Sequence, residues 1–68
     1  MNNYGNMKES LRRNAAYQQI GCEYMPGYGS DAFRITIQEG SKTISDIFCI
    51  YNDGDLNRAI NTLYGRVA

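Results

Sequence analysis

Residues 32–51 decide the fold, and they read AFRITIQEGSKTISDIFCIY. The first part of this stretch alternates apolar and polar residues with a period of two, which is typical of a strand with one buried face. Gly40-Ser41 then supplies a two-residue turn with glycine at its first position, and a second apolar run follows. The stretch therefore predicts a tight β-hairpin.

The turn also predicts the register of this hairpin. If Glu39 pairs with Lys42, then Ile35 lies opposite Asp46. The face predicted to join the core carries Phe33, Ile35, Ile37, Ile44, Phe48 and Ile50, and Asp46 lies among them. Because a lone buried carboxylate is costly, we expect a β-bulge near Ser45-Asp46 that turns the carboxylate outward. The alternative is that Asp46 stays buried on this face.

A helix is predicted directly after the hairpin. Residues 53–55 open it, and apolar residues then recur with helical spacing at Leu56, Ala59, Ile60, Leu63 and Val67. Asp53, Asp55 and Asn57 also match the first ligand positions of a calcium loop, but the sixth position is Arg58 and the twelfth is Tyr64. We therefore interpret the acidic residues as part of a turn and helix N-cap.

The N-terminal part of the chain predicts a second helix. Residues 1–5 are expected to form a frayed tail. Asn6 followed by Glu9 resembles a capping box, and apolar residues recur with helical spacing at Met7, Leu11 and Ala15. We expect a helix over about residues 7–19, ended by Gly21.

Residues 20–25 admit two interpretations, a short strand or an extension of the first helix. We favour the strand, because an isolated two-stranded hairpin is marginally stable in water and a third strand makes the sheet viable. Residues 26–31 hold proline and glycines and predict a loop. The predicted fold is one small α+β domain over residues 1–68, in the order α-β-β-β-α, with a three-stranded antiparallel sheet covered on one face by two helices.

Composition argues against most enzyme chemistry. The chain of 68 residues has no histidine, which removes the commonest general base and a common zinc ligand. Cys22 and Cys49 both fall in predicted strands, where we expect small buried residues. We therefore predict a protein that is not an enzyme, with no catalytic residues, no metal and no cofactor.

Charge and hydropathy bear on the partner and the compartment. Seven basic residues balance seven acidic ones, so no net charge attracts nucleic acid or an anionic membrane. The N-terminus lacks the basic and apolar regions of a signal peptide, and no apolar stretch approaches the ~20 residues that span a bilayer. We expect a cytoplasmic protein with reduced thiols and no membrane partner.

The order of elements resembles the double-stranded RNA-binding domain, over about residues 7–66. The resemblance also rests on the Pro-Gly-bearing loop of residues 26–31 and on the strand of residues 33–37. It implies binding to RNA through shape and phosphates, for which the candidate contacts are Lys8, Arg12, Arg13 and Lys42. The last helix, however, begins with acidic residues 53–55 where the family is lysine-rich. We therefore rank nucleic acid below protein as a partner.

The other face of the hairpin supplies the leading candidate site. Ile47, Cys49 and Tyr51 are predicted to form an apolar strip beside Arg34, and such strips can mark binding surfaces, where tyrosine and arginine are enriched. The predicted partner-binding residues are Arg34, Ile47, Cys49, Tyr51, Tyr24 and Tyr28.

These residues lead to the hypothesis of a small non-enzymatic protein that inhibits or regulates a larger protein or ribonucleoprotein by occupying its surface. Phage-encoded inhibitors, anti-CRISPR proteins among them, are similar in size and type. A homodimer, formed through the strip or through an edge strand, is a further hypothesis.

Overall fold

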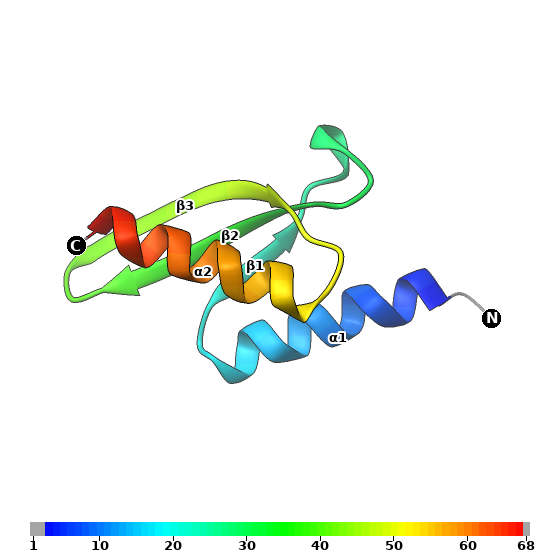
Figure 1. Cartoon of the computed structure of the whole chain (residues 1–68), viewed down its shortest axis with the longest axis horizontal. Helices are drawn as coiled ribbons and strands as arrows, with labels where there is room; N and C mark the ends of the chain where they lie inside the picture. Colours follow the sequence, from blue (N-terminus) through cyan, green and yellow to red (C-terminus); the bar gives the residue numbers. More distant parts are fainter. Residues whose placement is uncertain (1–2, 68) are drawn as a thin grey trace.

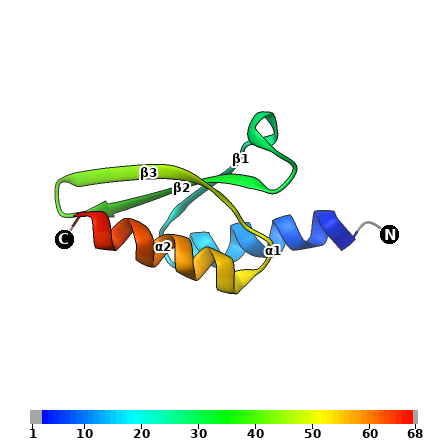
Figure 2. The same cartoon turned by 45° about the horizontal axis from the view of Figure 1, so that its top comes forward.

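The computed structural model describes the backbone of residues 3–67 and the side chains of residues 9–67, and it confirms the predicted order of elements. The elements are α1 (Asn3–Tyr17), β1 (Gly21–Tyr24), the 3-10 helix η1 (Pro26–Tyr28), β2 (Ala32–Glu39), β3 (Lys42–Cys49) and α2 (Asp53–Val67). The strands form an antiparallel sheet in the order β1-β2-β3. Both helices cover one face of this sheet, and η1 projects from one end of it (Figures 1 and 2).

The hairpin has the predicted register throughout. Glu39 pairs with Lys42, Ile35 with Asp46, and Phe33 with Phe48. Gly40 adopts a φ of 62°, whereas the φ of Ser41 is not positive, which is the pattern of a type II′ turn. Glycine at the first turn position thus fixes how the two strands align.

The predicted bulge near Ser45-Asp46 is wrong. Pairing runs without interruption from Lys42 to Cys49, so Asp46 keeps its place on the helix-covered side of the sheet. The Asp46 side chain nevertheless remains 48% exposed, because β3 is an edge strand and the helical layer ends beside it (Figure 2). The carboxylate reaches solvent without any distortion of the backbone.

The core lies between the covered face of the sheet and the two helices. Its buried members are Leu11, Ala15, Ile20, Phe33, Ile35, Ile37, Ile50, Leu56, Ala59, Ile60 and Leu63. Ile44 and Phe48, predicted for the core, are only half-buried, as is Val67 at the end of α2. The side chain of Met7 lies outside the described residues.

Helix α1 begins earlier than predicted. Residues 3–5 are helical, so the expected tail is wrong there, and residues 1–2 lie outside the described residues. Asn6 is inside the helix and is therefore not its N-cap. The sequence agrees with this start, since Tyr4, Met7 and Leu11 follow one another at intervals of three and four residues, which continues the helical spacing back to residue 4.

The same helix ends before Gly21, through a left-handed residue that is not glycine. Gln19 adopts a φ of 60°. The Gln19 N–H donates to the carbonyl of Ala16 at 3.0 Å, and the Ile20 N–H donates to the carbonyl of Ala15 at 2.8 Å. These two bonds form a Schellman motif, which directs the buried Ile20 into the core.

Replacing Gln19 with glycine is expected to raise the free energy of unfolding by about 1 kcal/mol, because a side chain is strained in the left-handed region and glycine is not. Urea denaturation measures the change. Gln18→Gly is the matched control, since Gln18 does not have a positive φ, and it is expected to lower stability by about 0.5–1 kcal/mol. A loss of stability in both variants would contradict the assignment.

The start of α2 has the predicted cap, with Asn52 as the capping residue. The Asn52 side-chain oxygen accepts the Asp55 N–H at 2.9 Å, and the Asp55 carboxylate accepts the Tyr51 N–H at 3.0 Å. Asn52 thus satisfies one of the N–H groups that the first turn of a helix leaves unpaired, and the Asp55 carboxylate binds the backbone just before the cap. This confirms the interpretation as an N-cap.

Candidate functional site

The uncovered face of the sheet brings three of the predicted partner-binding residues together. Arg34 on β2 lies directly opposite Ile47 on β3, and Cys49 follows two residues later on the same strand and face. Glu23 on β1 is the other cross-strand neighbour of Arg34, and the Arg34 guanidinium lies 3.4 Å from the Glu23 carboxylate. We refer to Arg34, Ile47 and Cys49 as the open-face patch.

Apart from the buried Ala32 at its end, the remainder of the open face on β2 and β3 is polar. It carries Thr36, Gln38, Thr43 and Ser45. Ile47 is half-buried and Cys49 is exposed. The patch therefore combines the apolar Ile47, the exposed Cys49 thiol and the ion pair of Arg34 with Glu23 on an open sheet face. Such a surface suits contact with another macromolecule more than enclosure of a small ligand.

Two of the predicted tyrosines lie elsewhere. Tyr24 is on the covered side, where its ring contacts the Phe33 ring at a centroid distance of 5.3 Å and its hydroxyl donates to the carbonyl of Ser30 at 2.8 Å. β3 ends at Cys49, so Tyr51 lies beyond the strand and does not extend the strip. The strip is shorter than predicted because the chain bends after β3 into the cap of α2, where the Tyr51 N–H donates to the Asp55 carboxylate.

Tyr28 occupies a place that supports its predicted role. It belongs to η1, its side chain is 67% exposed, and the loop that carries it leads into Ala32. Ala32 pairs with Cys49, so this loop and the open-face patch share one end of the sheet (Figure 1). Tyr28 and the patch can therefore contact one partner.

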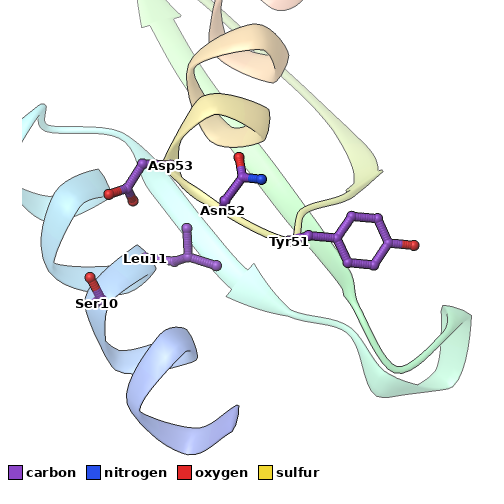
Figure 3. Close-up of a pocket in the computed structure, with 5 residues that line it drawn as sticks. All are labelled: Ser10, Leu11, Tyr51, Asn52 and Asp53. Atoms are coloured by element: carbon purple, nitrogen blue, oxygen red, sulfur yellow. The ribbon is translucent and has the colours of Figure 1, made fainter. Parts of the chain in front are cut away.

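A shallow hollow of about 180 Å³ lies where the helices meet the end of β3. Figure 3 shows its lining residues: Ser10, Leu11, Tyr51, Asn52 and Asp53. Asp53 accepts a hydrogen bond from the Asn14 amide at 3.2 Å, which links the two helices beside it. The hollow is smaller than the roughly 300–1,000 Å³ of ordinary ligand pockets.

The two cysteines differ in environment, although both were predicted to be buried. Cys22 is half-buried and Cys49 is exposed, because Cys22 faces the helices and Cys49 faces the open side. Burial raises the pKa of the Cys22 thiol, and the charge of nearby Arg12 opposes that effect only in part. A thiol with a raised pKa forms less of the reactive thiolate.

Iodoacetamide is therefore expected to modify Cys49 before Cys22 in the folded protein. Mass spectrometry of peptides from a time course measures the order. In denaturant both thiols are expected to react at similar rates. In the folded Cys49→Ser variant, only the slow modification of Cys22 is expected to remain. Faster modification of Cys22 would mean that the two faces of the sheet are wrongly assigned.

A charge pair that sequence spacing did not reveal joins Asp46 to the last turn of α2. The Arg66 guanidinium donates to the Asp46 carboxylate at 2.7 Å, and the Ile47 N–H donates to the other carboxylate oxygen at 2.8 Å. The hydrogen bond from Arg66, followed by that from Ile47, lowers the pKa of Asp46. Both side chains are about half exposed, so solvent and salt screen the pair.

Asp46 is expected to contribute to the pH dependence of stability. Because its pKa is lower in the folded than in the unfolded chain, its stabilising effect is complete above the unfolded value of about 3.9 and disappears as the pH falls through the folded value. The difference in melting temperature between wild type and Asp46→Asn should therefore be larger at pH 7 than at pH 2. Glu39→Gln on β2 is the control for loss of a charge, and an equal difference at both pH values would contradict the prediction.

The described basic residues of the nucleic-acid alternative lie in two separate places. Arg12 and Arg13 are exposed on α1, where Arg13 lies 3.9 Å from Glu9. Lys42 begins β3 at the hairpin turn, which lies away from α1 in both views (Figures 1 and 2). The side chain of Lys8 lies outside the described residues. Arg12 and Arg13 therefore do not form one basic surface with Lys42.

Comparison of the chain with protein-family models, with curated proteins and with solved structures finds no match. Within residues 9–67, no group of three or more cysteine and carboxylate side chains is placed to hold a metal ion. Neither helix of the described chain has the length and apolar character of a bilayer-crossing segment. The fold and the open-face patch are thus the features from which a function can be argued.

Proposed function

We propose that this protein binds a larger protein or ribonucleoprotein through the open face of its sheet and inhibits or regulates that partner. The observation that carries the proposal is the direct pairing of Arg34 with Ile47 on a face that neither helix covers. Arginine and aromatic residues recur in the energetic centres of protein interfaces, and Tyr28 stands exposed at the same end of the sheet.

The electrostatics of this surface favour a protein partner. Arg34 is balanced by Glu23 at 3.4 Å, so the surface presents a charge pair instead of the basic field that attracts phosphates. Phage-encoded inhibitors of the anti-CRISPR type are the class that we favour, on the basis of chain length and neutral net charge.

The proposal is tested by affinity capture from host lysate with a tagged protein and nuclease treatment. The patch variant is Arg34→Glu with Ile47→Thr, in which threonine keeps the β-branched shape of the strand residue. The matched control is Arg13→Glu with Tyr17→Thr, which makes the same charge change and removes an exposed apolar group on α1. Wild type and control should capture the same nuclease-resistant partner, and the patch variant should lose it.

Two outcomes would count against this function. Retention of the partner by the folded patch variant would place the binding surface elsewhere. Recovery of nuclease-sensitive material alone, with salt-sensitive binding to duplex RNA, would favour the nucleic-acid alternative. The captured partner's own activity, where it can be assayed, then separates two roles. Inhibition of that activity by wild type and not by the patch variant identifies an inhibitor, and no inhibition by either identifies a passive binding protein.

A further inference from the structure

Strand β3 is an edge strand with few of the features that protect such edges. It has eight residues, contains no proline and pairs with β2 without a bulge. Among residues 3–67, no strand lies along its other side (Figure 1). Long, regular edges of this kind pair readily with strands of other chains.

The geometry of the hairpin shows which backbone groups face outward. A two-residue turn makes Glu39 and Lys42 a hydrogen-bonded pair, and such pairs alternate along an antiparallel ladder. The backbone groups of Thr43, Ser45 and Ile47 therefore point away from β2. The bond from the Ile47 N–H to the side chain of Asp46 agrees with this direction.

A second copy of β3 fits this edge in one antiparallel register that spans the strand. With Ser45 on the two-fold axis, Thr43 of each copy lies opposite Ile47 of the other, and their outward backbone groups can bond. In this register the open faces of the two copies become one face of a continuous sheet. The helices of both copies therefore lie together on its other face.

Asp46 opposes this register in two ways. Its carboxylate already accepts the Ile47 N–H at 2.8 Å, which is a donor that the second copy needs. It also lies where Ile44 of the second copy would approach, and an apolar neighbour would remove water from the charged group at a cost. Arg66 holds the other carboxylate oxygen at 2.7 Å and so fixes the side chain in this position.

We propose that the β3 edge is a self-association surface and that Asp46, oriented by Arg66, prevents this edge from pairing with a second chain. The partner that fits the open edge is a second copy of this chain, paired antiparallel about Ser45. The inference is independent of the partner proposed for the open-face patch, because it concerns the backbone edge of β3.

Sedimentation velocity over a wide range of protein concentration tests the proposal. Wild type is expected to be a monomer, and Asp46→Thr is expected to form a dimer whose fraction rises with concentration, since threonine suits a strand. Arg66→Gln, on the exposed end of α2, should shift the equilibrium in the same direction by a smaller amount. Glu39→Thr is the control, because it removes a carboxylate from the same hairpin on β2 and leaves the outer edge of β3 unchanged. This variant should remain a monomer.

A proline substitution tests whether the dimer uses the predicted edge. The Ser45 N–H points away from β2, so Ser45→Pro preserves the hairpin ladder and blocks the ladder to a second copy. Added to Asp46→Thr, it should restore the monomer while far-ultraviolet circular dichroism stays native.

Three results would overturn the proposal: a dimeric wild type, a dimer that persists in the folded proline variant, or folded Asp46→Thr and Arg66→Gln proteins that are both monomeric. If Asp46→Thr does not fold, Arg66→Gln alone decides the outcome.

Discussion

Phe33→Ala is expected to lower the free energy of unfolding by about 3–5 kcal/mol, the range for removal of a buried aromatic ring. Phe33 is 1% exposed at the centre of the sheet, where its ring contacts Tyr24 and its cross-strand partner is Phe48. At about 0.05–0.15 kcal/mol per residue, a chain of this length has a total stability of the same order. The variant should therefore be partly unfolded at room temperature, as measured by circular dichroism and urea titration.

Tyr28→Ala is the matched control, because it removes an aromatic ring from an exposed loop position. Its effect should stay within about 0.5 kcal/mol, as for other surface substitutions. Similar losses in the two variants would mean that the η1 loop, and not the sheet, carries a large part of the stability.

Leu63→Ala is expected to lower the free energy of unfolding by about 2–5 kcal/mol. Leu63 is fully buried on α2, where it belongs to the same core cluster as Ile35 and Ile37 of the central strand. The cavity that alanine leaves cannot collapse easily, because the rigid central strand β2 lies opposite. A melting curve of the variant measures the loss.

Asn61→Ala, two residues earlier on the exposed side of α2, is the control for Leu63→Ala. Alanine has the higher helix propensity, so this variant should be as stable as wild type or slightly more stable. If Leu63→Ala cost no more than Asn61→Ala, the assignment of the buried face of α2 would be wrong.

Local chemistry made most of this fold predictable from the sequence. The alternation of residues 32–38 identified a strand, and glycine at position 40 fixed the turn and with it the whole register. Residues 53–67 showed both a cap and an apolar stripe, so the helix and its buried face followed. Each of these signals lies within a few residues of its effect.

The features that were missed depend on residues that are distant in the chain or strained. Asp46 and Arg66 are 20 positions apart, and no spacing rule connects an edge strand to the end of a helix. Gln19 ends α1 in a conformation that glycine normally adopts, so the prediction placed the end at Gly21.

The candidate site was only partly predictable, for the same reason. Residues that alternate along one strand, such as Ile47 and Cys49, were placed together correctly. Tyr51 was not, because the chain leaves the strand after Cys49 and enters the cap of α2, where the Tyr51 N–H donates to the Asp55 carboxylate. Tyr24 was assigned by proximity in sequence, whereas its direction depends on the pairing of β1 with β2.

The order of the strands has a consequence for folding kinetics. Because β1, β2 and β3 are neighbours in the chain as well as in the sheet, each strand finds its partner by closing a short loop, and short loops lose little entropy on closure. Domains with such local topology fold faster than domains of equal stability built from distant pairings. The strand meander should therefore form early, with each helix packing on the strand that is its neighbour in the chain.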